Sequence, residues 1–139
     1  MNPILRNILT VLAGLVIGGI ANMLLIQISG YIIPPPEGAD VKTIEGLQSS
    51  IHLFQPKHFL MPFLAHALGT LVGAAITTAL AANRALWLCV LVASFSFVGG
   101  VVAVKMLPAP MWFNVTDLTL AYFPMGWLGY KTVTAIKGK

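Results

Sequence analysis

Charged side chains are scarce in this sequence of 139 residues. Lysine, arginine, aspartate and glutamate together make up 9% of it, whereas hydrophobic types make up 58%. An average soluble domain carries about 25% charged residues, and a chain this short needs them to cover its large relative surface. The deficit argues against an ordinary water-soluble domain and indicates that lipid surrounds most of the chain.

Cysteine and catalytic motifs are also nearly absent. Cys89 is the only cysteine, so no internal disulfide can form, and its apolar neighbours are typical of a small buried hydrophobe. No GxSxG, Walker, GxGxxG, CxxC or HExxH pattern occurs. The basic residues form no stripe of the kind that binds nucleic acid. We therefore expect no catalytic residue, metal site, cofactor or nucleic-acid partner, and a protein that is not an enzyme.

Four apolar stretches are long enough to cross a bilayer, since about 20 helical residues span its ~30 Å hydrocarbon core. The expected spans cover about residues 8–33, 58–82, 85–107 and 118–135. Prolines 34, 35 and 36, and prolines 108 and 110, interrupt the chain between spans. The predicted fold class is all-α, a single integral membrane four-helix bundle over residues 1–139. Three spans with an interfacial hairpin are the alternative, because the last stretch is the least hydrophobic.

The longest polar segment, residues 37–57, separates the first two spans. Its apolar residues recur at three- and four-residue intervals and form one helical stripe: Val41, Ile44, Leu47, Ile51 and Phe54. Asp40 is the expected N-cap, and Pro56 ends the helix. We expect a short helix in the outer membrane interface. An irregular loop is the alternative, which Gly46 favours.

The distribution of basic residues predicts the orientation in the membrane. An even number of spans places both termini and the turn at residues 83–84 on one side. That side holds Arg6, Arg84, Lys131, Lys137 and Lys139. The other side holds Lys42, Lys57 and Lys105, together with Glu37, Asp40, Glu45 and Asp117. The positive-inside rule then puts both termini in the cytoplasm, and no acidic residue falls within an expected span.

Few polar side chains lie inside the expected spans. At helical rise His66 is ~13 Å below the outer surface, counted from Lys57, and Asn22 is ~18 Å deep, counted from Pro34. An ionisable group in hydrocarbon is a functional candidate, because leaving it unpaired is costly. The structural alternative is a neutral imidazole that bonds Asn22 or a serine. The expected polar layer consists of Asn22, His66, Thr70 and Ser94 or Ser96.

Small residues at four-residue spacing predict close helix packing. Gly14 and Gly18 form such a pair in the first span, and Gly69 and Gly73 form another in the second. Lipid provides no hydrophobic force between helices, so glycine faces that let backbones approach must contribute. The two faces are expected to contact each other, or to mediate homodimerisation.

Several segments resemble one family of small bacterial inner-membrane proteins. They are Pro34–Asp40, His52–Phe59, Pro62–Thr70, Leu107–Pro110 and the closing stretch with Tyr122, Pro124 and Trp127. The resemblance covers nearly the whole chain. It implies a four-span protein of the bacterial inner membrane, and it implies no activity.

Three functions fit these patterns. The first is a non-catalytic accessory, assembly or interaction protein, with the lipid bilayer and a homo-oligomer or larger membrane complex as its partners. The second is an oligomeric permease for small solutes or ions that uses the polar layer around His66. The third is a membrane-embedded enzyme that uses His66 on a lipophilic substrate, which requires a cleft open from His66 to lipid or to the outer surface.

Overall fold

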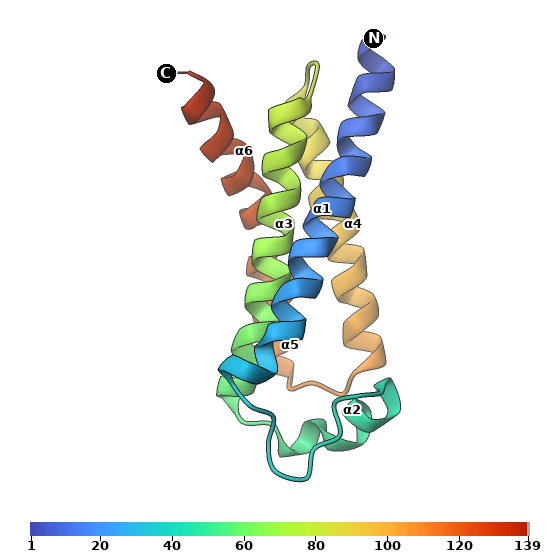
Figure 1. Cartoon of the computed structure of the whole chain (residues 1–139), viewed down its shortest axis with the longest axis vertical. Helices are drawn as coiled ribbons and strands as arrows, with labels where there is room; N and C mark the ends of the chain where they lie inside the picture. Colours follow the sequence, from blue (N-terminus) through green and yellow to red (C-terminus); the bar gives the residue numbers. More distant parts are fainter. Residues whose placement is uncertain (139) are drawn as a thin grey trace.

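A computed structural model describes residues 1–138, which are helical and contain no strand, so the prediction of an all-helical fold is confirmed. Short connections join the helices, and the longest irregular segment lies at the end opposite the termini (Figure 1). The elements are α1 Pro3–Ile32, α2 Ile44–Ser50, η1 Ile51–Leu53, η2 Pro56–Phe59, α3 Leu60–Leu80, α4 Ala85–Met106, α5 Met111–Leu120 and α6 Phe123–Lys137.

Three helical stretches are long and apolar enough to cross a membrane: α1, α4 and the continuous η2–α3 segment Pro56–Leu80. They lie at the positions of the first three predicted spans. α1 begins at Pro3 because the Asn2 side chain accepts a hydrogen bond from the backbone of Ile4 and caps the helix. Large apolar side chains on these helices point outward; Val16, for example, is 61% exposed. Such surfaces suit lipid as the surrounding solvent.

The predicted fourth span differs from the structure. In place of one helix over 118–135, two helices meet at Ala121–Tyr122. α5 starts directly after Pro110, so the chain enters the helical bundle well before residue 118. Pro124 lies in the first turn of α6, where its missing N–H costs nothing, and it prevents α5 from continuing.

The segment between α1 and α3 is only partly helical. α2 and η1 form the helical portion, and the rest of residues 37–57 before η2 is irregular. Thr43, and not the predicted Asp40, is the N-cap of α2: its hydroxyl accepts a hydrogen bond from the backbone of Gly46. Asp40 instead accepts a hydrogen bond from the backbone of Lys42, because it lies in the turn that precedes the helix.

α3 is the central helix and packs against α1, α4 and α6 (Figure 1). Gly14 and Gly18 of α1 lie directly against Gly73 and Gly69 of α3. A Cβ atom added to Gly18 would lie 2.5 Å from the Gly69 carbonyl oxygen, and one added to Gly14 would lie 2.6 Å from that of Gly73. The two small-residue faces therefore occupy each other within one chain, which leaves neither of them for a second copy.

Both termini and the α3–α4 turn lie at the same end of the molecule (Figure 1). Side chains from α1 and α6 hold that turn in place. Arg6 Nε donates to the Leu80 carbonyl at 2.8 Å, and Lys137 Nζ donates to the Ala79 carbonyl at 2.7 Å. Asn7 Oδ1 accepts from the Ala82 backbone at 3.0 Å. Arg6 and Lys137 thereby satisfy carbonyls that the end of α3 leaves unpaired.

Candidate functional site

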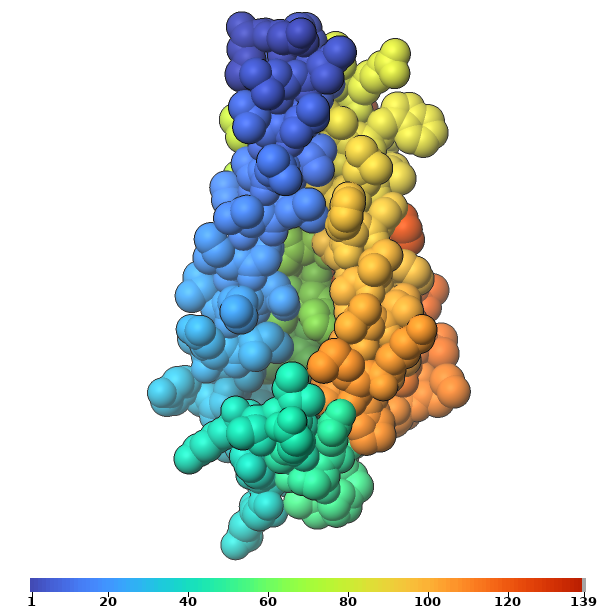
Figure 2. All heavy atoms as spheres, turned by 90° about the vertical axis from the view of Figure 1, so that its right-hand side faces the viewer, coloured from blue at the N-terminus to red at the C-terminus, as the bar shows by residue number. Residues whose placement is uncertain are grey.

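A cavity of about 280 Å³ lies between α1, α3 and α4. Figure 2 shows it as a hollow between α1 and α4, with α3 visible at its floor. We call it the lateral cavity, because it opens at the side of the bundle and not at an end. It is lined by Gly14, Leu15, Gly18, Gly19, Asn22, His66, Gly69, Thr70, Val92, Ser96, Gly99, Gly100 and Tyr122.

Most of the predicted polar layer meets in this cavity. Asn22, His66, Thr70 and Ser96 all line it, whereas Ser94 does not. Residues two positions apart on a helix point about 200° apart, so Ser94 and Ser96 cannot face the same space. The Ser94 hydroxyl donates instead to the carbonyl of Val90, one turn back on its own helix.

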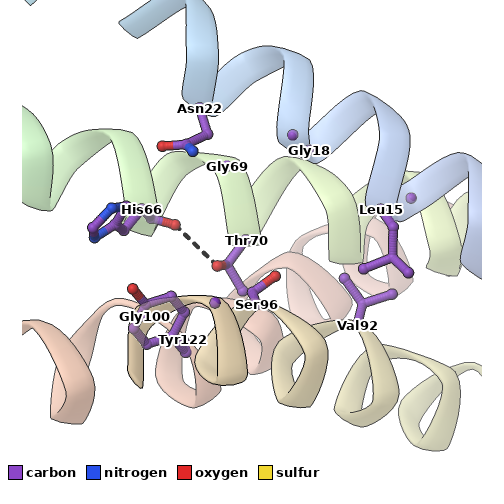
Figure 3. A pocket seen from close by; sticks show the side chains of 13 residues that line it. Leu15, Gly18, Asn22, His66, Gly69, Thr70, Val92, Ser96, Gly100 and Tyr122 are labelled. Atoms are coloured by element: carbon purple, nitrogen blue, oxygen red, sulfur yellow. Dashed lines mark hydrogen bonds between the residues drawn. The ribbon is translucent and has the colours of Figure 1, made fainter. Parts of the chain in front are cut away.

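The polar lining is gathered at one end of the lateral cavity. Figure 3 shows the Asn22 side chain reaching from α1 toward the His66 ring, while Leu15 and Val92 lie together at the other end. The Thr70 hydroxyl donates to the His66 backbone carbonyl at 2.9 Å, a local bond that keeps it on the α3 surface. The cavity thus has a polar end and an apolar end.

The polar end contains a hydrogen-bonded pair of ionisable side chains, His66 and Asp117. His66 Nδ1 lies 2.8 Å from Oδ1 and 3.0 Å from Oδ2 of Asp117 on α5. The Tyr122 hydroxyl donates to Asp117 Oδ2 at 2.9 Å, and its ring stacks on the imidazole. Asp117 is only 2% exposed, so its carboxylate depends on these two partners in place of water.

Asp117 lies in surroundings that the sequence did not predict. It was expected outside the spans, among the acidic residues of the outer side, and its carboxylate is buried in the helical bundle. The expected partner of His66 was Asn22 or a serine, whereas the structure pairs it with Asp117. The error arose because polar residues around Asp117 hid the start of α5. The one available signal was His66 itself, since a buried imidazole requires a partner.

Two polar atoms of the lateral cavity have no partner among residues 1–138. Asn22 Oδ1 is buried and accepts no hydrogen bond. His66 uses Nδ1 for Asp117, and the structure gives its Nε2 no hydrogen bond within the described chain. Buried polar atoms are nearly always paired, so an unpaired acceptor that lines a cavity indicates a binding position.

A second cavity of about 170 Å³ lies next to the first, toward the α2 end of the molecule. Its lining is mostly apolar and includes Phe54 and Phe59, and it shares His66 and Gly100 with the lateral cavity. The His66–Asp117 pair therefore lies between two hollow regions.

A packed layer lies between the lateral cavity and the end of the bundle that holds the termini. The Thr10 and Thr77 hydroxyls donate to each other's backbone carbonyls at 3.2 and 3.3 Å, and Thr77 is fully buried. Val92 and Cys89 are also buried, and Cys89 Sγ contacts the Thr78 hydroxyl at 2.9 Å. The lateral cavity ends against this layer. Within residues 1–138 no three His, Cys, Asp or Glu side chains gather as a metal site.

Comparison of the chain with models of known protein families, with curated proteins and with solved structures finds no match, so the site's geometry alone carries the functional argument.

Proposed function

We propose that the protein crosses a bacterial inner membrane four times, with both termini in the cytoplasm. The three long apolar helices support three of the crossings. α5 and α6 together support the fourth, because their 10 and 15 residues run from the α2 end of the bundle to the end with the termini (Figure 1). The basic end that holds Arg6 and Lys137 supports the orientation. The bacterial inner membrane rests on the family resemblance.

Within that membrane, the protein binds a lipophilic molecule non-catalytically, holding its polar head in the lateral cavity. The observation that carries this proposal is the unpaired Asn22 Oδ1 beside the His66 ring. A ligand that enters from the lipid between α1 and α4 supplies a partner to that atom and leaves its apolar portion in the bilayer. Pockets with a few convergent polar groups in an apolar wall are typical ligand sites.

This function keeps the expectation of a non-catalytic interaction protein and gives it a lipid as the partner. A permease fits the geometry less well, because the Thr10–Thr77 contact and buried Val92 separate the cavity from the end with the termini. Transport by one chain would require this packed layer to open.

A membrane-embedded enzyme is the second candidate, and the Tyr122–Asp117–His66 chain of hydrogen bonds favours it. A carboxylate that orients an imidazole toward a cavity is an arrangement used in acid–base catalysis. Hydrolysis by a protein nucleophile is poorly supported, because the Thr70 hydroxyl is bonded to a backbone carbonyl. Turnover of membrane lipids in nanodiscs, lost in His66→Gln, would favour this candidate over simple binding.

Native mass spectrometry of the protein extracted from its own membrane in mild detergent tests the binding function. Gly19 on α1 and Gly99 on α4 line the cavity, and a Cβ atom added to either meets no atom within 4 Å. Leucine at both positions should narrow the opening without a clash inside the protein. We expect one lipid-sized adduct per wild-type chain and its loss in Gly19→Leu/Gly99→Leu.

Gly30→Leu is the matched control, since Gly30 is also a helical glycine of α1 with open space around it but does not line the cavity. It should keep the adduct. A wild-type spectrum without any adduct, or an adduct that persists in the double variant, would refute binding in the cavity. The same spectra report a stoichiometric protein partner or a defined homo-oligomer, the results expected of an accessory subunit or a permease.

A further inference from the structure

The hydrogen-bonding groups of the lateral cavity limit which class of ligand can bind there. This inference rests on the proposed lipid-binding function. The two groups to satisfy are Asn22 Oδ1 and His66 Nε2. Asn22 Oδ1 is an acceptor and calls for a donor. Whether His66 Nε2 donates or accepts depends on where the protons of the His66–Asp117 pair reside.

His66 Nδ1 and the Tyr122 hydroxyl both bond the Asp117 carboxylate, so Nε2 is the ring nitrogen that remains for a ligand. A ligand hydroxyl can donate to this nitrogen or accept from it, so it suits either arrangement of the protons. No lysine or arginine lines either cavity.

The same absence of cationic residues argues against an anionic headgroup. A phosphate brought into the lateral cavity would meet Asn22, Thr70 and Ser96 but no lysine or arginine side chain, and the His66 ring is already paired with the Asp117 carboxylate. Burying an anion without a positive partner is strongly unfavourable. The arginine and lysine that bond the α3–α4 turn, Arg6 and Lys137, lie at the far end of the bundle and are engaged with backbone carbonyls.

The size of the cavity limits what enters it. Pockets that enclose a drug-sized molecule measure roughly 300–1,000 Å³, so a cavity of about 280 Å³ holds a headgroup and not a whole lipid. Gly19 and Gly99 leave space on the two sides of the opening, through which an acyl chain can pass into the bilayer.

We propose that the lateral cavity binds a lipid with an uncharged, hydroxyl-bearing headgroup, of the diacylglycerol or long-chain alcohol type. A hydroxyl supplies the donor that Asn22 Oδ1 requires, and its oxygen can accept from His66 Nε2 when that nitrogen carries a hydrogen. Phosphate-bearing lipids are disfavoured at this site.

The test compares two probes with the same acyl chains, dioleoylglycerol and dioleoylphosphatidylglycerol, added separately to delipidated full-length protein in detergent. Native mass spectrometry measures the bound fraction. Dioleoylglycerol should bind one per chain. Asn22→Leu, which keeps the side-chain volume close and removes the acceptor, should weaken it about tenfold. Gly99→Leu should abolish binding, and Gly30→Leu should leave it unchanged.

The outcomes separate this inference from the proposed function. If dioleoylphosphatidylglycerol binds as well or better, and Gly99→Leu still abolishes its binding, the headgroup class is wrong and lipid binding in the cavity stands. If dioleoylglycerol binds equally to wild type and Asn22→Leu, while thermal unfolding shows both to be folded, the role given to Asn22 is wrong. If neither probe binds in a way that Gly99→Leu affects, the proposed function fails as well.

Discussion

His66 Nδ1 on α3 lies 2.8 Å from Asp117 Oδ1 on α5, although 51 positions separate the two residues in the chain. The contact ties the central helix α3 to α5. Asp117 is 2% exposed, so without His66 its carboxylate would be buried with only the Tyr122 hydroxyl as a partner.

We therefore expect His66→Leu to lower stability strongly, on the order of 3–5 kcal/mol, the cost of leaving a buried carboxylate without its partner. Asp117→Leu should cost less, because the imidazole that it leaves is 23% exposed and can be neutral. The double variant should cost clearly less than the sum of the two single changes, because neither side chain is then left without its partner. Unfolding in mixed micelles with increasing denaturing detergent measures all four proteins. Additive losses would show that the two side chains do not depend on each other.

The Tyr122 hydroxyl is the second partner of Asp117, and Gly100 on α4 leaves room for it. A Cβ atom at Gly100 would collide with that hydroxyl and with two carbons of the Tyr122 ring. We expect Gly100→Ala to displace Tyr122 and to destabilise the protein about as much as Tyr122→Phe, roughly 1–3 kcal/mol. Thermal unfolding of both single variants, of Tyr122→Leu and of Gly100→Ala/Tyr122→Leu provides the measurement. If Gly100→Ala costs as much in the Tyr122→Leu background as in wild type, the collision is not with the Tyr122 side chain.

The contact between α1 and α3 predicts a sharp difference among glycines of one helix. A Cβ atom at Gly18 would lie 2.5 Å from the Gly69 carbonyl oxygen, whereas one at neighbouring Gly19 meets nothing within 4 Å. Gly18→Leu and Gly69→Leu should therefore separate the helices and reduce the yield of folded protein, while Gly19→Ala should be neutral or slightly stabilising. Size-exclusion profiles and melting temperatures in detergent distinguish these results. Equal behaviour of Gly18→Leu and Gly19→Leu would contradict the packing described.

The proposed topology predicts which residues react with reagents on each side of the membrane. In a Cys89→Ala background, Gly138→Cys should be labelled by a membrane-impermeant maleimide only after the cells are opened. Glu37→Cys, on the exposed loop after α1, should be labelled in spheroplasts with intact membranes. Labelling of both positions from the same side would mean an even number of crossings between residues 37 and 138, where the proposed topology requires three.

The sequence predicted those parts of the structure that leave a pattern among neighbouring residues. Apolar runs bounded by prolines predicted α1, α3 and α4, and the four-residue spacing of glycines identified the faces of α1 and α3 that meet. α5 escaped detection because Asn114 and Asp117 give it the polarity of a loop, and its burial depends on a partner from another helix. The His66–Asp117 pair could not be predicted, because no local pattern in the sequence connects residues 51 positions apart.

The interruption at Ala121–Tyr122 has a consequence for how the chain is assembled. Asp117 on α5 cannot remain in lipid alone, because a lone carboxylate at that depth is unfavourable for insertion. The earlier apolar helices insert without such a partner and are synthesised first, so His66 in α3 is in the bilayer before α5. In the proposed topology, α5 and α6 are therefore expected to insert last, when the Asp117 side chain can bond to His66.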